Sequence, residues 1–172
     1  MNNYQILATE LQQTEAKRIE AIAGNLMQLM DIVKNSIVIN TERGEPRIES
    51  VLSDDELYAL AIRIPTECIY IQEQANKLAL SNTLSSILTD SDISENVQLL
   101  YGSKGDARER QKRAEAMCGD KLLRDAAVRQ SIKILNDYID RADKVYEGIK
   151  KIIDARSREF ILNGKPGYPI GQ

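Results

Sequence analysis

The sequence contains no histidine and no tryptophan, and it has a single phenylalanine among its 172 residues. Without histidine, the chain lacks the commonest general base, the commonest metal ligand and the base of serine or cysteine nucleophile pairs. With so few large aromatic side chains, an aromatic-walled substrate pocket is difficult to build. The 26 Asp and Glu residues are spread along polar faces and form no catalytic fingerprint. We therefore predict a protein that is not an enzyme and that holds no metal or other cofactor.

Cysteines and long apolar runs are also scarce. Cys68 and Cys118 form no CxxC pair, and the chain supplies no further ligands for a zinc site, so both are predicted to be buried thiols in a reducing compartment. No run of about 18 apolar residues occurs, and the N-terminal segment does not combine a basic start with an apolar block. We expect a cytoplasmic protein with no membrane partner.

Charge is distributed unevenly along the chain. Residues 1–100 contain 7 Lys and Arg against 15 Asp and Glu, which gives −8, whereas residues 101–172 contain 16 against 11, which gives +5. An acidic first half and a basic second half favour pairing between halves or subunits, an anionic partner for the second half, or both.

The N-terminal half shows the periodicity of helices. Apolar residues recur at helical spacing over residues 4–34, which predicts one amphipathic helix. Gly44 and Pro46 interrupt residues 36–52, so this connection is predicted to be a loop or at most a small hairpin. Ser53 and Glu56 form a capping box that begins a second helix, in which Pro65 is expected to mark a kink or a restart. We expect this helix to weaken into a break over the polar residues 89–94, followed by a short helix.

The clearest pattern lies in the C-terminal half and predicts a long helix that starts near Asp120 and ends before Asn163. Its apolar residues follow steps of three and four, a repeat that is typical of a coiled-coil seam. The repeat comprises Val128, Ile132, Leu135, Ile139, Ala142, Tyr146, Ile149, Ile153 and Phe160. About 40 residues at about 1.5 Å per residue make a rod of about 60 Å, which needs a partner helix from the same chain, as a hairpin, or from another subunit.

These patterns predict an all-α protein, a long antiparallel helical hairpin or coiled coil with a long C-terminal amphipathic helix, that forms a homo-oligomer. The predicted oligomer interface consists of seam residues, namely Ile132, Leu135, Ile139, Tyr146, Ile149 and Ile153. Three regions are expected: an acidic helical region over 1–94 with the irregular connection 36–52, a basic turn and assembly helix over 95–162, and a flexible tail over 163–172.

The stretch YGSKGDARERQKRAEAM, residues 101–117, allows two interpretations. In the first, Gly102 and Gly105 let backbone N–H groups approach an anion, Tyr101 stacks on bases, and basic side chains bind successive phosphates. These basic residues are Lys104, Arg108, Arg110, Lys112 and Arg113. In the second, the glycines form a turn, Asp106 caps a helix and the charges are an ordinary solvated face.

Four features follow one another from Leu99 to Phe160: an aromatic residue, a basic turn with glycines, a short charged helix and the long amphipathic helix. The short helix contains the pattern Arg-x-x-x-Ala-Glu, which spans Arg110 to Glu115. This order, and YGSKGD most closely, resembles the UvsY type of bacteriophage recombination mediator and similar small helical phage proteins. The resemblance covers about the last 70 residues.

The resemblance implies a helical protein that assembles through its C-terminal helices into a ring. Such mediators bind single-stranded DNA, engage the single-strand-binding protein and load a RecA-type recombinase. By position, Lys104, Arg108 and Arg110 would contact DNA. The assembly seam would comprise Ile132, Leu135, Ile139, Ile149 and Ile153. The predicted function is therefore a non-enzymatic mediator of phage recombination or replication in the host cytoplasm.

Two other functions are compatible with the sequence. A phage-encoded inhibitor could bind a host defence or replication protein by using the acidic half as a nucleic-acid mimic, which requires a continuous acidic face. The nearest candidates for such a face are Glu42, Glu45, Glu49, Asp54, Asp55 and Glu56. A coiled-coil scaffolding protein without a DNA role is the second alternative.

Overall fold

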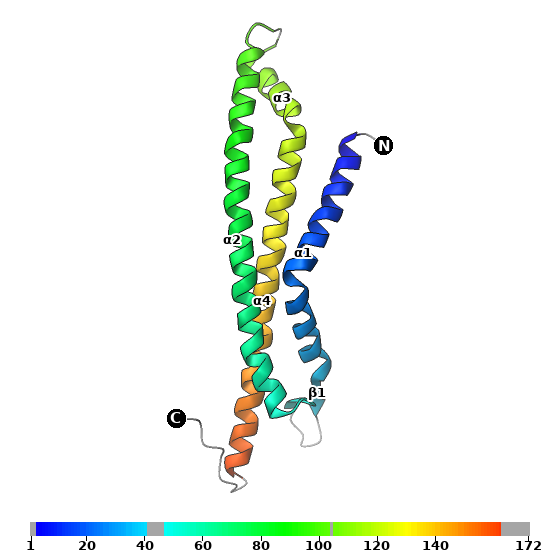
Figure 1. The fold of residues 1–172 in the computed structure, drawn as a ribbon, viewed down its shortest axis with the longest axis vertical. Helices are drawn as coiled ribbons and strands as arrows, with labels where there is room; N and C mark the ends of the chain where they lie inside the picture. The colour runs from blue at the N-terminus through cyan, green and yellow to red at the C-terminus, as the bar shows by residue number, and fades with distance from the viewer. Residues whose placement is uncertain (1–2, 41–46, 104, 163–172) are drawn as a thin grey trace. The chain divides into compact units, whose positions relative to one another are not determined.

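The computed structural model of the chain describes residues 3–40, 47–103 and 105–162. These ranges form α1 (Asn3–Ser36), β1 (Ile37–Asn40), β2 (Arg47–Ser50), α2 (Asp54–Leu99), α3 (Ala107–Met117) and α4 (Gly119–Leu162) (Figure 1). The prediction of an all-α fold is confirmed, and the connection 36–52 contains the small hairpin that was one of its two expected forms. The predicted tail, 163–172, lies outside the described residues.

The capping box at the start of α2 forms as its spacing predicts. The backbone N–H of Ser53 donates to Glu56 Oε2 at 2.8 Å, and the N–H of Glu56 donates to Ser53 Oγ at 3.3 Å. The hydrogen bonds from Ser53 lower the pKa of the Glu56 carboxyl, because they favour its charged form. The helix start is therefore fixed by two reciprocal bonds across one turn.

The predicted break over residues 89–94 is wrong, because α2 continues through it to Leu99. Thr89 and Ser94 donate their hydroxyls to carbonyl oxygens four residues back, at 3.0 and 2.8 Å. Such bonds satisfy a polar side chain without interrupting the helix. The helix also contains Pro65 in its interior, so no new helix starts there.

Contacts within the chain group its residues into two compact units, and α1, α2 and α4 contribute to both. Unit 1 comprises Met1–Ile22 and Gln72–Asn136, and unit 2 comprises Ala23–Ile71 and Asp137–Gln172. Each unit thus combines residues from the ranges 1–94 and 95–162, and the division between those ranges stays a prediction.

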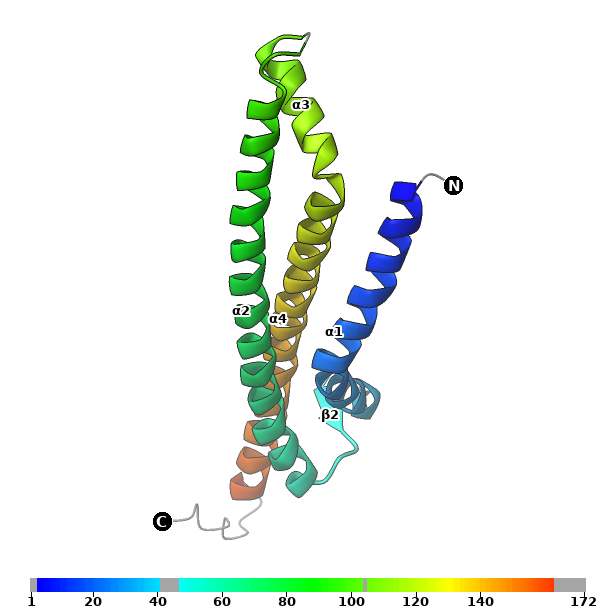
Figure 2. The same ribbon diagram turned by 45° about the horizontal axis from the view of Figure 1, so that its top comes forward.

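Within each unit α2 and α4 lie side by side and antiparallel, as both ribbon views show (Figure 1, Figure 2). In unit 1, contacts follow this direction: Ser85 donates to Asp125 at 2.7 Å, and Lys121 pairs with Asp92. Residues that come later in α2 therefore contact residues that come earlier in α4. This is the arrangement expected if the partner helix comes from the same chain.

The interior of unit 2 is aliphatic. Its completely buried large side chains come from all three helices and comprise Leu26, Leu57, Ile64, Ile71 and Ile149. Side chains of this size contribute roughly 1.5–3 kcal/mol each when they are fully buried. Unit 2 therefore has the apolar core that a small helical domain needs.

The interior of unit 1 combines apolar side chains, such as the completely buried Leu135, with buried polar ones. Asp125 is buried and accepts a hydrogen bond from Ser85, and Thr89 Oγ1, whose proton it shares with the Ser85 carbonyl oxygen, lies 3.4 Å away. Glu15 of α1 is also buried and accepts from Ser131 Oγ at 2.8 Å. These bonds satisfy carboxylates that would otherwise destabilise the fold. Helix packing in unit 1 thus depends on directional polar contacts between positions far apart in sequence.

In unit 2, Arg156 joins α4 to the hairpin and to the start of α2. Its guanidinium donates to Ser50 O at 2.6 Å, to Leu52 O at 2.8 Å and to Asp54 Oδ1 at 2.7 Å. The hairpin is also tied to α1, because the N–H of Val51 donates to the carbonyl oxygen of Ser36 at 2.9 Å. Arg156 occupies a seam position of the three-four repeat, and these contacts explain the charge there.

Replacing Arg156 with Gln is expected to lower the free energy of unfolding by about 1–3 kcal/mol, because three charge-assisted hydrogen bonds are lost. Urea denaturation followed by circular dichroism measures the change. Arg158→Gln on the same helix is the matched control, because Arg158 is exposed, and it should change stability by less than about 0.5 kcal/mol. Equal stability of the two variants would contradict the assigned role of Arg156.

Candidate nucleic-acid interface

Residues 101–103 lie in a turn after α2, and Ala107–Met117 form the short helix α3, both in unit 1. The turn begins as α2 ends: the N–H of Tyr101 donates to Gln98 O at 3.0 Å, and that of Ser103 to Leu100 O at 2.9 Å. Gly105 has φ 130°, which L side chains rarely adopt, and an added Cβ would lie 2.5 Å from Glu109 Oε2. A glycine is therefore required at this position by backbone conformation.

Asp106 caps α3, as the second interpretation of this stretch predicts. Its carboxylate accepts from the N–H of Glu109 at 2.8 Å. The other end of α3 rests on a small cluster of Ile93, Ala114 and Cys118, with Val97, Leu100 and Leu122 packed against it. One face of α3 is thereby attached to α2 and α4, and its opposite face is left to solvent.

Arg110 is the basic residue that the turn holds in place. Its guanidinium donates to the carbonyl oxygen of Gly105 at 2.8 Å and lies 5.4 Å from the centroid of the Tyr101 ring. Tyr101 is 79% exposed, which is high for a large aromatic side chain. A fixed cation on an exposed ring forms a surface to which both bases and phosphates can bind.

The remaining basic residues of the predicted DNA site are distributed around this pair. Arg108 and Lys112 are exposed and lie one helical turn apart, so both face solvent on the same side of α3. Arg113 is exposed as well, and it has an interaction of its own within the chain. Lys104 lies outside the described residues. The structure thus brings Arg108, Arg110, Lys112 and Arg113 together on one short helix.

The predicted assembly residues lie on the inward side of α4. Leu135 in unit 1 and Ile149 in unit 2 are completely buried, and Ile132, Ile139, Tyr146 and Ile153 are half-buried. The chain's own helices therefore cover most of this seam, and Leu135 and Ile149 offer no surface to another subunit.

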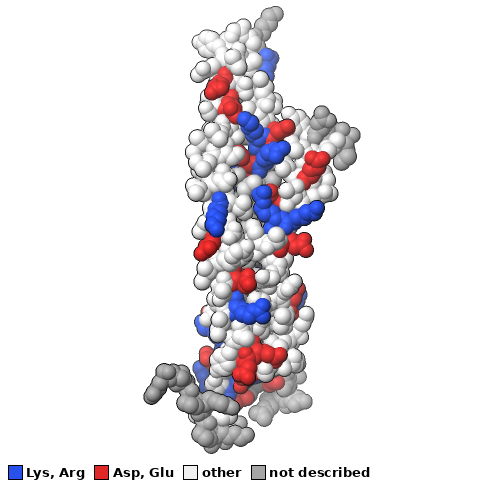
Figure 3. Space-filling view, viewed as in Figure 1, with Lys and Arg blue, Asp and Glu red and all other residues white. Residues whose placement is uncertain are grey.

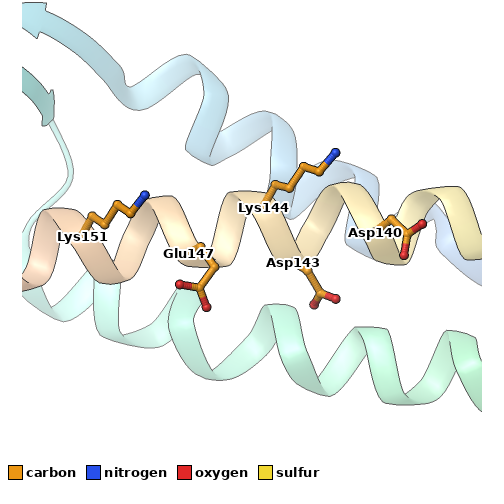
Figure 4. A pocket seen from close by; sticks show the side chains of 5 residues that line it. All are labelled: Asp140, Asp143, Lys144, Glu147 and Lys151. Carbon is orange, nitrogen blue, oxygen red and sulfur yellow. The ribbon is translucent and has the colours of Figure 1, made fainter.

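A depression on α4 in unit 2 is lined by Asp140, Asp143, Lys144, Glu147 and Lys151. Asp143 and Glu147 extend from one side of the helix, and Lys144 and Lys151 from the other (Figure 4). Glu147 also accepts a hydrogen bond from Lys150 Nζ at 2.8 Å, which raises the pKa of that lysine. Three carboxylates and two ammonium groups line this depression, so its formal charge is only −1 and it does not attract an ionic substrate of either sign strongly.

Cys68 of unit 2 carries a thiol whose pKa differs from its ordinary value. Burial, and to a smaller extent the negative charges of Asp143 and Glu67, raises the pKa of its thiol to about 11. A thiol with this pKa is almost entirely protonated at neutral pH, whereas reactive cysteines have lowered pKa values. The prediction of buried, unbridged cysteines is confirmed for both residues.

One surface was not recognised from the sequence. The outward side of α2 carries Leu80, Leu84, Ile87 and Leu88, all more than half exposed. The available signal was the run LALSNTLSSILT, residues 78–89, which has no charged residue in a chain that is 28% charged.

On the face shown in Figure 3, acidic and basic side chains are interspersed, without a continuous acidic surface.

In the ranges that the structure describes, no group of three or more acidic or cysteine side chains is arranged to hold a metal ion, and no helix is long and apolar enough to cross a membrane. Comparisons with protein families, with curated proteins and with solved structures find no match to this chain.

The raised pKa of Cys68 predicts a loss of stability at alkaline pH. Because the folded thiol holds its proton more tightly than the unfolded one, its contribution is complete below about pH 9 and is lost between pH 9 and about 11. The free energy of unfolding, relative to that of Cys68→Ala, should therefore fall over this range and stay constant below it. Urea denaturation at a series of pH values measures this difference.

A reactivity measurement provides the control. In a Cys118→Ala background, which leaves Cys68 as the reporting thiol, modification by a disulfide reagent at pH 8 should be at least about tenfold slower for the folded than for the urea-unfolded chain. Equal rates would show that the Cys68 thiol is not buried and that its pKa is not raised.

Proposed function

We propose that this protein binds single-stranded DNA through Tyr101 and α3 and acts as a non-enzymatic mediator of phage recombination or replication. The observation that carries the proposal is the Tyr101 and Arg110 pair. An aromatic ring that is 79% exposed is held against a guanidinium, at the start of a helix with further exposed basic residues. The resemblance to UvsY-type mediators also supports the proposal, and it extends it to the single-strand-binding protein and a RecA-type recombinase as partners.

The geometry suits a single strand better than a duplex. Unpaired bases can stack on an exposed ring at about 1–3 kcal/mol per base, whereas the bases of a duplex are already stacked. Arg108 and Lys112, about 6 Å apart at their Cβ atoms, supply charge for the adjacent phosphates. Because Arg110 is already oriented by the Gly105 carbonyl, little side-chain entropy is lost when it meets a phosphate.

The contribution of each subunit is small, since four described basic residues share α3 with Glu109 and Glu115. Assembly into a homo-oligomer would bring several such sites onto one strand and raise the overall affinity through effective concentration. A strand held at several sites is less available to a competing coat protein. This is the mechanism by which a mediator without a catalytic residue promotes recombinase loading.

The inhibitor alternative receives less support. Of the acidic residues nearest to a continuous face, Glu42 and Glu45 lie outside the described residues, and Asp54 is paired with Arg156 in unit 2. A protein mimic of DNA needs unpaired carboxylates at regular spacing. A scaffolding role is compatible with the exposed apolar side of α2 and does not exclude DNA binding.

Replacing Arg108 and Lys112 together with Gln is expected to weaken binding to a fluorescent oligothymidylate and to reduce the slope of log affinity against log salt by about 1 to 1.5, because two phosphate contacts are lost. Fluorescence anisotropy at several salt concentrations measures both effects. Lys144→Gln with Lys151→Gln removes the same charge from unit 2 and should leave the slope unchanged. If both double variants behave alike, α3 is not the binding site.

Tyr101→Leu tests the stacking contribution separately. The loss is expected to be about 1–3 kcal/mol of binding free energy with an unchanged salt slope, because no charge is removed. A wild-type protein that binds duplex as tightly as oligothymidylate, or that binds neither, would contradict the proposed function.

A further inference from the structure

The outward side of α2 in unit 1 is an apolar surface without a partner in the described part of the chain. Leu80, Leu84, Ile87 and Leu88 are 57–67% exposed. Their spacing of four, three and one residues places them on one side of the helix. Solvent-exposed helices normally present charged residues on this side.

The surroundings of these residues are equally unusual. The run 78–89 has no charge over three turns of helix, and its other members are mainly Ser, Thr and Ala. Small neutral side chains permit the close approach of another helix. The inward side of the same segment carries Thr89, which reaches the buried Asp125, and Asn82, whose Oδ1 is buried without a hydrogen-bond partner. This segment of α2 therefore has its more apolar side toward solvent.

Charged residues flank the apolar surface in a symmetric order. Lys77, Leu84, Leu88 and Glu95 follow one another at spacings of seven, four and seven residues, which places all four on one line along the helix. Along this line the two leucines lie in the middle, with a cation at one end and an anion at the other. The four positions are spaced symmetrically about residue 86. Lys77 and Glu95 are both exposed, and neither has an ion pair or hydrogen bond within the described ranges.

We propose that this surface binds the same surface of a second copy of the chain, with the two α2 helices antiparallel and the two-fold axis at residue 86. In this register each Leu84 meets Leu88 of the second copy, and each Lys77 meets Glu95 of the second copy. A two-fold axis makes every contact occur twice, which is the ordinary form of a homodimer interface. A parallel pair in register would instead place Lys77 against Lys77.

The second copy is a better occupant than an unrelated helix because the line is complementary to itself. Its charges cancel only against a surface with the same residues in the reverse order, and the neutral run between them adds no repulsion to self-association. The proposed surface lies on α2 and shares no residue with Tyr101 or α3, so it is independent of the proposed function. Failure of DNA binding would leave it intact, and loss of the dimer would change only the number of sites held on one strand and not the DNA contacts of a single α3.

Charge reversal provides the test, with mass measured by light scattering and sedimentation equilibrium on the full chain. We expect the wild type to be dimeric. Lys77→Glu and Glu95→Lys should each weaken self-association about tenfold, because each places like charges opposite one another twice. An equimolar mixture of the two variants should recover the affinity of the wild type, since their heterodimer contains two ion pairs, one in the original orientation and one reversed.

Asp90→Lys is the matched control, because Asp90 is exposed on α2 beside the neutral run but lies off the line, and it should leave the dimer unchanged. Leu84→Glu should give a monomer with the helical content of the wild type. The proposal is overturned if the wild type is monomeric, if the single charge reversals assemble as well as the wild type, or if their mixture recovers nothing.

Discussion

The burial of aliphatic side chains in unit 2 is the constraint on which the rest of the structure depends. α1, α2 and α4 each supply completely buried residues there, among them Leu26, Ile64 and Ile149. The interior of unit 1 contains the buried Leu135 and a small apolar cluster, and in addition buried carboxylates and hydroxyls, such as Asp125 with Ser85. A hydrogen bond to a charged group contributes a net ~1.5–3 kcal/mol, about as much as a buried aliphatic side chain, but it requires a specific geometry. The same three helices therefore have an aliphatic core in one unit and a mixed apolar and polar interior in the other.

This difference explains where the two candidate surfaces lie. Both the Tyr101 and α3 site and the apolar side of α2 belong to unit 1, whose interior includes buried polar residues such as Asp125 and Thr89. On α2, Asn82 and Thr89 take inward positions beside the half-buried Leu78, whereas Leu84 and Leu88 lie outside. The exterior of this segment is therefore available for association.

Local signals in the sequence were sufficient to predict the helices. The Ser53 and Glu56 capping box, the Asp106 cap and the three-four repeat of α4 each depend on residues within one or two turns of each other. The break predicted over residues 89–94 failed because Thr89 and Ser94 bond to carbonyl oxygens four residues back, and because Thr89 is buried beside Asp125, which is 36 positions away. Spacing within one segment carries no information about such a contact.

The candidate sites could also be predicted from the sequence only in part. The exposed positions of Arg108 and Lys112 follow from composition, but the hydrogen bond of Arg110 to the Gly105 carbonyl depends on the conformation of the turn. The outer surface of α2 was missed because periodicity shows that a helix has an apolar side without showing which side faces the core. In α2 the inward side is recognised only when α4 is in place to bury it.

The contacts of Arg156 have a consequence for the order of folding. They join α4 to residues that are 102 to 106 positions away along the chain. Closing a loop of that length costs entropy before any contact compensates for it, whereas the turn between α2 and α3 closes over a few residues. Folding is therefore expected to begin at the turn and to proceed along the α2 and α4 pair, with the guanidinium of Arg156 reaching the hairpin among the last events.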